Sequence, residues 1–252
     1  MTVWAIADLH LSFGISDKSM DVFGPQWTDH AARVKKKWLE LITVDDLVLI
    51  AGDISWAMTP EQAKADLQWI HELPGTKVLL RGNHDYWWTS ISKVQKVLPP
   101  SMHLVQNDAF FWNDIAIGGT RLWDSLEYSF GQFVDYRENA RANTAIKETS
   151  ESEQEKIFQR ELIRLETSLK MLDTKATSGQ RRIAMTHYPP IGADLLPSRA
   201  AALLEKYKME ICVFGHLHNL KPNSTPFGIR NGVHYILTAC DAIDFTPVKL
   251  IQ

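Results

Sequence analysis

Five apolar runs in this chain are each followed by residues whose side chains can bind a metal ion. Near-continuous apolar runs are typical of buried parallel strands. The runs and the residues that follow them are 3–7 with Asp8 and His10, 47–51 with Asp53, 77–80 with Asn83 and His84, 182–186 with His187, and 211–214 with His216 and His218. Because ligands gather beyond the carboxyl ends of strands in α/β sheets, the sequence predicts a metal site at one sheet edge.

The spacing of these residues favours a common centre. Asp8 and His10 are two residues apart, as are His216 and His218, so each pair points the same way in extended backbone. Asp53 stands alone after a glycine, where its two carboxylate oxygens could bridge two ions. Each motif by itself is common in turns, and the prediction depends on their order along the chain.

Asn83 and His84 are adjacent, so their side chains should diverge and serve two different purposes. Three glycines, Gly52, Gly82 and Gly215, stand just before or beside predicted ligands. Glycine tolerates backbone conformations that other residues avoid, so we expect tight turns at these positions.

The composition is that of an ordinary globular protein, with 45% hydrophobic and 23% charged residues. At 252 residues the chain is long enough to bury a core without disulfides, and we expect a single domain over residues 1–252. The net charge of −3 gives no electrostatic basis for extended contact with nucleic acid or an anionic membrane. The sequence makes no prediction of the oligomeric state.

Two features favour a cytoplasmic location. No apolar run approaches the roughly 20 residues that span a bilayer, and no signal peptide is evident at the start of the chain. The two cysteines, Cys212 and Cys240, lie in or after apolar runs, which predicts buried free thiols in a reducing compartment.

Helical patterns alternate with strands through the first hundred residues. Thr59-Pro60-Glu61-Gln62 is a capping box with proline at the first helical position, so a helix should begin there and end near Pro74. This alternation predicts a largely parallel sheet. Residues 102–105, 110–112 and 115–117 read as three short strands that could form a small meander.

Later segments carry weaker signals. The runs 233–237 and 248–251 are predicted to be antiparallel strands that close a second sheet. Residues 123–178 are more charged, and apolar residues at helical spacing within them predict a long amphipathic helix. Packing of this helix against the sheet is the favoured interpretation, and a cap that partly covers the site is the alternative.

The ordered set of motifs resembles the signature of the calcineurin-like metallophosphoesterase superfamily. The matching residues are Asp8-Leu9-His10, Gly52-Asp53, Gly82-Asn83-His84-Asp85, His187 and Gly215-His216-Leu217-His218. The resemblance implies an α/β fold in which a two-sheet β-sandwich is flanked by helices, in four layers α/β/β/α. It also implies a dinuclear metal site at the carboxyl edge of the strands.

The resemblance further implies which of these residues bind each metal ion. One ion would be held by Asp8, His10 and His218, the second by Asn83, His187 and His216, and Asp53 would bridge the two. Mixed oxygen and imidazole ligands favour manganese, iron, zinc or cobalt over calcium or magnesium. We therefore expect two divalent transition-metal ions as cofactors.

The implied activity is hydrolysis of a phosphomonoester or phosphodiester. Two ions about 3.5–4 Å apart lower the pKa of a shared water, and the resulting hydroxide would attack phosphorus while His84 protonates the leaving group. The expected substrate is small and phosphorylated or nucleotide-like. Alternatives are a nucleotide pyrophosphohydrolase and a non-catalytic binding scaffold, and the retention of every matched position disfavours the scaffold.

The chain departs from the protein phosphatase branch of the superfamily at one position. That branch has an aspartate three residues after the bridging aspartate, where it orients the catalytic histidine, and this chain has Trp56. A protein phosphatase is therefore disfavoured. Asp85, next to His84, is the residue predicted to support His84 in catalysis.

Three residues beside the motifs are candidates for substrate contact. Trp56 and Tyr86 could line the mouth of the site and stack on a ring, and ordinary packing explains them equally well. Arg81 could contact a phosphate, although a structural role is the more common one for such an arginine.

Overall fold

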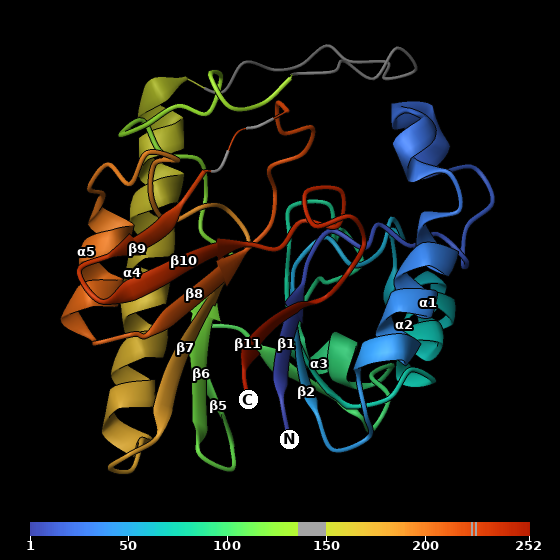
Figure 1. The fold of residues 1–252 in the computed structure, drawn as a ribbon, viewed down its shortest axis with the longest axis horizontal. Coiled ribbons are helices and arrows are strands. Elements are labelled where there is room, and N and C mark those ends of the chain that lie inside the picture. The colour runs from blue at the N-terminus through green and yellow to red at the C-terminus, as the bar shows by residue number, and fades with distance from the viewer. Residues whose placement is uncertain (136–149, 223, 225) are drawn as a thin grey trace.

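Two mixed β-sheets face each other, and helices cover their outer faces (Figure 1). The computed structural model describes residues 1–135, 150–222, 224 and 226–252. This arrangement confirms the predicted two-sheet sandwich with flanking helices.

The first sheet has the strand order β11-β1-β2-β3-β4, in which β1 to β4 are parallel and β11 is antiparallel to β1. Its outer face packs on α1, α2 and α3. The elements are β1 (Val3–Ile6), β2 (Leu47–Ala51), β3 (Thr76–Leu80), β4 (Met102–Val105), β11 (Val248–Ile251), α1 (His30–Leu41), α2 (Pro60–His71) and α3 (Ile91–Gln95). Two short 3₁₀ helices, η1 (Met20–Phe23) and η2 (Pro25–Trp27), precede α1.

The second sheet has the order β5-β6-β7-β8-β10-β9, with antiparallel edge pairs and a parallel centre. Helices α4 and α5 cover its outer face (Figure 1). The elements are β5 (Ala109–Trp112), β6 (Ile115–Thr120), β7 (Arg181–Thr186), β8 (Ile211–Phe214), β9 (Gly228–Arg230), β10 (Val233–Leu237), α4 (Glu151–Lys175) and α5 (Arg199–Lys206).

The central strands are buried on both faces, which explains their continuous apolar sequence. In β2, for example, Leu47, Leu49 and Ala51 face the other sheet, whereas Val48 and Ile50 face the helices. The helices are defined by local signals as well. The predicted capping box is confirmed, because Thr59 accepts a hydrogen bond from the Gln62 amide while Gln62 accepts one from the Thr59 amide.

Two predictions about strand pairing are wrong. The three short strands do not form a meander, because β4 extends the first sheet, parallel to β3, whereas β5 and β6 form a hairpin in the second sheet. The last strand does not close the second sheet, since β11 returns to the first sheet beside β1. Short strands carry no sequence signal that names their partner, so pairing depends on which sheet edge is free.

The predicted amphipathic helix corresponds to α4, which packs on β5 and β6 through buried side chains. These side chains include Phe158, Leu162, Leu165, Leu169 and Leu172. Residues 136–149 lie outside the described residues, so a cap over residues 123–178 stays a prediction.

Two further observations concern the composition. Cys212 and Cys240 are buried free thiols, as predicted. Among the residues that the structure describes, no helix has the length and apolar character needed to cross a membrane.

Candidate metal centre

The predicted ligands converge at the edge where the carboxyl ends of the parallel strands of both sheets meet. Ligand atoms of Asp8, His10 and His218 lie within 4.8 Å of one another, and so do those of Asp8, Asp53 and His187. Asp53 Oδ2 lies 3.7 Å from His10 Nε2 and 3.5 Å from His187 Nε2. Asp53 therefore stands between the two groups, as a bridging carboxylate would.

The remaining two ligands complete the group around His187. Asn83 Oδ1 lies 2.7 Å from His187 Nε2 and 3.1 Å from His216 Nδ1. The structure thus brings together all seven residues predicted to hold metal, from both sheets and from opposite ends of the chain.

The second ring nitrogen of His187 and of His218 faces an acceptor. His187 Nδ1 lies 3.0 Å from the Ala51 carbonyl oxygen, and His218 Nδ1 lies 2.8 Å from Asp241 Oδ1. Each Nδ1 must therefore carry a proton, and in the neutral ring the Nε2 lone pair points toward the other ligand atoms. Acceptor atoms this close together need either bound protons or a metal ion between them, and a set of carboxylate, amide and imidazole donors suits a divalent transition metal.

Burial and charge affect the pKa values of these histidines in opposite directions. Burial opposes protonation of His187, yet the carboxylates of Asp53 and Asp8 raise its pKa to about 9. Burial also opposes protonation of His218, and Asp241 raises its pKa to about 9. Without metal, the anionic surroundings bind protons, and a metal ion would displace them.

Several ligands lie in strained backbone. Asp8, His10, Asp53 and His216 have φ values of 58°, 44°, 50° and 72°, in the left-handed region that residues other than glycine rarely adopt. Strain of this kind typically costs about 1–3 kcal/mol per residue and concentrates at functional sites. The strand ends are therefore held in conformations that aim the side chains at the centre.

Two of the glycines serve a purpose other than the expected tight turn. A Cβ atom on Gly82 would collide with the Asp53 carboxylate, and one on Gly215 would collide with the Asp8 carboxylate. Only Gly52 among the three has a positive φ, of 96°. Gly82 and Gly215 thus provide space for ligand carboxylates.

His84 lies apart from the ligand cluster, whereas its neighbour Asn83 points into the cluster. The His84 ring packs 4.7 Å from the Trp56 ring and 5.7 Å from the His10 ring, measured between centroids. Its Nδ1 has no hydrogen-bond partner among the described residues. Burial lowers the pKa of His84. Trp56, which stands where protein phosphatases have an aspartate, thus contacts the histidine by packing.

Asp85 does not contact the His84 ring, and the expectation that it supports His84 directly is wrong. Its buried carboxylate accepts hydrogen bonds from the Ile54 and Ser55 amides at 2.9 and 3.1 Å, the Gly82 amide at 2.8 Å and the Trp87 indole at 2.9 Å. Buried amides in loops need an acceptor, and this carboxylate provides it. Asp85 therefore ties the loop after β2 to the loop after β3.

Asp241 is a functional candidate that was not predicted from the sequence. Its carboxylate accepts hydrogen bonds from His218 Nδ1 and from the Asn219 amide, both at 2.8 Å. A carboxylate in this position orients a ligand imidazole and raises its basicity. The signal was present, because Asp241 is an acidic residue shortly after the apolar strand β10.

A large cavity of about 570 Å³ opens above the ligands. His10, His84, His216 and His218 form its floor, and its walls are largely aromatic and apolar. The wall residues include Lys18, Met20, Phe23, Trp27, Trp56 and Tyr86. Trp56 and Tyr86 therefore stand where the predicted substrate contacts require.

Arg81 does not line this large cavity. Its side chain faces a separate cavity of about 40 Å³, beside Arg121, Arg164 and Glu161. Glu161 is buried and lies 2.6 Å from Arg164 and 3.9 Å from Arg121. The predicted contact of Arg81 with phosphate thus has no support in the geometry, because β3 turns this residue away from the ligands.

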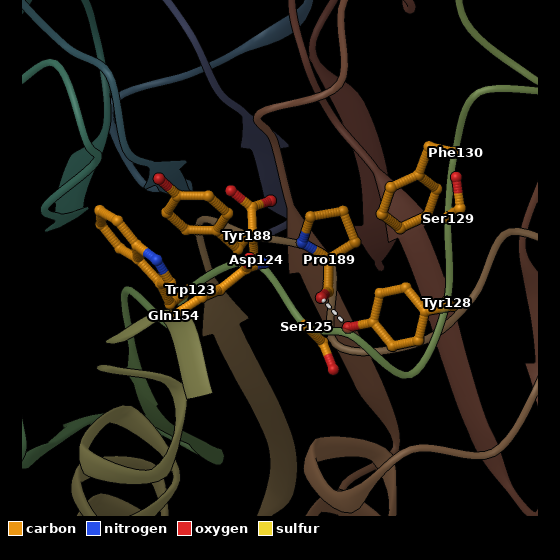
Figure 2. A pocket seen from close by; sticks show the side chains of 9 residues that line it. All are labelled: Trp123, Asp124, Ser125, Tyr128, Ser129, Phe130, Gln154, Tyr188 and Pro189. Carbon is orange, nitrogen blue, oxygen red and sulfur yellow. Dashed lines mark hydrogen bonds between the residues drawn. The ribbon is translucent and has the colours of Figure 1, made fainter. Parts of the chain in front are cut away.

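A further cavity, of about 210 Å³ and called the small cavity below, adjoins His216 through two of its lining residues, Asp124 and Tyr188, which Figure 2 shows. Asp124 Oδ1 is 3.7 Å from His216 Nε2, and the Tyr188 ring is 4.0 Å from the His216 ring. The small cavity is lined by Trp123, Asp124, Ser125, Tyr128, Ser129, Phe130, Gln154, Tyr188 and Pro189.

The two-sheet sandwich and the cluster of carboxylate, amide and imidazole groups at its edge together agree with a metallophosphoesterase fold. The chain belongs to the calcineurin-like phosphoesterase family, whose model matches residues 1–220. The resemblance seen in the motifs is thereby confirmed.

Two phage proteins and one solved structure are similar to this chain. The chain is similar to the Gene 66 proteins of Mycobacterium phages D29 and L5, at 39% identity over 83 residues and 38% over 86 residues. The matches cover 33% and 32% of this chain and 40% and 39% of those proteins, so less than half of either relative is spanned. The structure is also similar to that of phosphopantetheinyl hydrolase from Mycobacterium tuberculosis, with a TM-score of 0.55 and 16% identity over 94% of this chain and 88% of that one. This likeness shows the fold.

Proposed function

We propose that this protein hydrolyses a small phosphate ester, a phosphomonoester or a phosphodiester, with two divalent metal ions and with His84 as general acid. The observation that carries the proposal is the convergence of carboxylate, amide and imidazole ligand atoms around two adjacent positions, with His84 beside them in the lining of the large cavity. A histidine that is close to the ligands but not among them is free to transfer a proton.

The proposed ligand sets follow from the contacts. Asp8, His10, Asp53 and His218 would hold one ion, and Asp53, Asn83, His187 and His216 the other. When bound, such ions polarise a phosphoryl oxygen and lower the pKa of water to about 7. Manganese, iron, zinc and cobalt all suit these donors.

The chain's own residues would then complete the reaction. One water gives up a proton to solvent and its oxygen forms a bond to phosphorus, the bond from phosphorus to the leaving oxygen breaks, and protonated His84 gives that oxygen a proton. Burial lowers the pKa of His84, which makes its protonated form a stronger acid and also less populated at neutral pH. Packing on Trp56 holds the ring, and the backbone amide of His84 donates to Asp53 Oδ1 at 2.8 Å. Such a general acid contributes about 10²–10⁴-fold.

A nucleotide pyrophosphohydrolase is the second candidate. The aromatic walls of the large cavity favour it, because Trp56 and Tyr86, which are partly exposed, could stack on a base. A cytoplasmic location and the absence of nucleic-acid or membrane partners remain predictions from the sequence.

The test is a panel assay with manganese-loaded protein against phosphomonoesters, phosphodiesters and nucleoside pyrophosphates. A phosphopantetheinyl compound belongs in the panel because a structurally similar protein is named a phosphopantetheinyl hydrolase. Hydrolysis in one class would support the corresponding candidate. Well-folded, metal-loaded protein that hydrolyses nothing would favour the binding scaffold.

A further inference from the structure

We infer that the small cavity beside His216 is a second substrate subsite, which takes a planar group carrying N–H or O–H donors on the non-leaving side of the phosphorus. This inference rests on the proposed function and narrows it, because a substrate with groups on both sides is a diester or a diphosphate ester. It excludes a simple monoester as the preferred substrate.

The two cavities adjoin one ligand, His216. His216 forms part of the floor of the large cavity, and Asp124 and Tyr188 of the small cavity contact the same ring at 3.7 and 4.0 Å. His84, the proposed acid, lines only the large cavity, so the leaving group departs there. A second substituent on the phosphorus would then be directed toward the small cavity.

The size of each cavity supports this division. Pockets that bury a whole drug-sized ligand have volumes of about 300–1,000 Å³. The large cavity, at about 570 Å³, falls within that range, whereas the small cavity, at about 210 Å³, falls below it. The small cavity therefore suits one part of a substrate.

The lining of the small cavity selects the chemistry of that part. Trp123 and Phe130 contribute partly exposed aromatic rings to this lining, and the buried Tyr188 packs between Trp123 and His216. Asp124 and Gln154 add acceptors, and no lysine or arginine lines this cavity within the described part of the chain. A phosphate would be repelled by Asp124, whereas an amine, amide or hydroxyl hydrogen would be attracted.

The walls of the small cavity are held in place before any ligand binds. Tyr128 Oη donates to the Pro189 carbonyl oxygen at 2.7 Å, as Figure 2 shows. Arg199 joins Glu127 at 3.0 Å and Glu155 at 2.6 Å, which fastens the segment after β6 to α4 and α5. A cavity with walls fixed in this way binds a ligand at a smaller entropic cost.

The experiment uses three substrates with the same leaving group: p-nitrophenyl phosphate, p-nitrophenyl phenyl phosphate and its 3-aminophenyl counterpart. We expect kcat/KM to rise in that order. Gln154→Trp should fill the small cavity and lower kcat/KM for both diesters by about tenfold or more, since burial of an aromatic ring is worth at least one such factor. The monoester should change less than about twofold, since it leaves this cavity empty.

Two further variants make the test specific. Lys156→Trp places the same bulky residue at an exposed position on α4 and should change none of the three rates. Asp124→Asn should remove the preference for the aminophenyl over the phenyl diester, by about tenfold. Because this preference is a ratio, any effect of Asp124 on His216 cancels.

Three outcomes would overturn the inference: a preference for the monoester, equal losses on all three substrates in Gln154→Trp, or an unchanged amino preference in Asp124→Asn. If metal-loaded protein hydrolyses none of the substrates, the proposed function fails separately. Calorimetric binding of a non-hydrolysable phosphonate analogue of the aminophenyl diester then decides. Binding by the unmodified protein that is weaker in Gln154→Trp supports the subsite. Equal binding by the two proteins, or no binding by the unmodified protein, refutes it.

Discussion

The two cavities that adjoin His216 differ in size and in chemistry. The large cavity holds His84, aromatic side chains and Lys18, whose Nζ lies 5.2 Å from the centre of the Trp56 ring. The small cavity has ring faces as well but adds the Asp124 carboxylate and lacks a lysine or arginine among its described lining residues. One metal-binding edge can therefore present different surfaces to the two sides of a phosphate, and mutations should affect these sides separately.

Removal of the residue that serves both sides should have the largest effect. Asp53→Ala deletes the carboxylate between the two ligand groups, so hydrolysis of every substrate should fall to background. Metal content by mass spectrometry should fall in parallel. Asp45→Ala, at an exposed carboxylate, is the control and should retain both. Full metal content and activity in Asp53→Ala would contradict the bridging position.

Loss of the proposed acid should affect the leaving-group side. His84→Ala should lower kcat by about 10²–10⁴-fold on substrates with a poor leaving group. Metal content should stay unchanged, because His84 is not among the ligands. The loss should shrink for p-nitrophenyl esters, whose leaving oxygen needs no proton, and a loss independent of the leaving group would argue against the role.

Loss of Asp241, which contacts His218, should weaken metal binding without changing the relative rates on different substrates. Asp241→Ala removes the acceptor of the His218 Nδ1 proton and should weaken metal binding by about 10–100-fold. Metal titration measures this affinity, and kcat/KM ratios among substrates should be unchanged. Asp241→Asn, which keeps an acceptor oxygen, should recover part of the affinity. Equal metal affinity in the unmodified protein, Asp241→Ala and Asp241→Asn would show that the contact between Asp241 and His218 does not contribute to metal binding.

The smallest effect is expected from the wall of the large cavity. Trp56→Leu should raise KM about 2–10-fold for substrates with an aromatic leaving group, since an aromatic pair is worth about 0.5–1.5 kcal/mol beyond its buried area. The KM for a substrate with a small leaving group should stay the same. Gln154→Trp, in the small cavity, is the reciprocal control. A uniform rise in KM for all substrates would remove the distinction between the two sides.

The fold and the ligands could be predicted because their signals are local. Each buried strand has its own apolar run, and each ligand follows directly on such a run, so Asp8 and His216 need no knowledge of each other to be recognised. The order of the motifs along the chain then identifies the family. Pairing of the short strands could not be predicted in this way, because β4 and β11 complete whichever sheet edge lies next to them.

The surroundings of the ligands depend on segments far apart in the chain. Asp85 was expected to support His84, and it instead bonds to loop amides about 30 residues earlier in the sequence. Trp56 approaches His84 through the packing of two loops, and Asp241 reaches His218 from 23 residues later in the chain, beyond β9 and β10. No residue type at these positions carries such information alone.

The sequence by itself determined the sandwich fold, the residues offered to metal and the family. The tertiary structure alone decided what stands around them: the packing of Trp56 on His84, the carboxylate of Asp241 behind His218, the diversion of Arg81 and the small cavity beside Asp124. The physical reason is that a ligand's identity is set by the chemistry of one side chain. A cavity, in contrast, exists only where several separate segments pack and leave space between them.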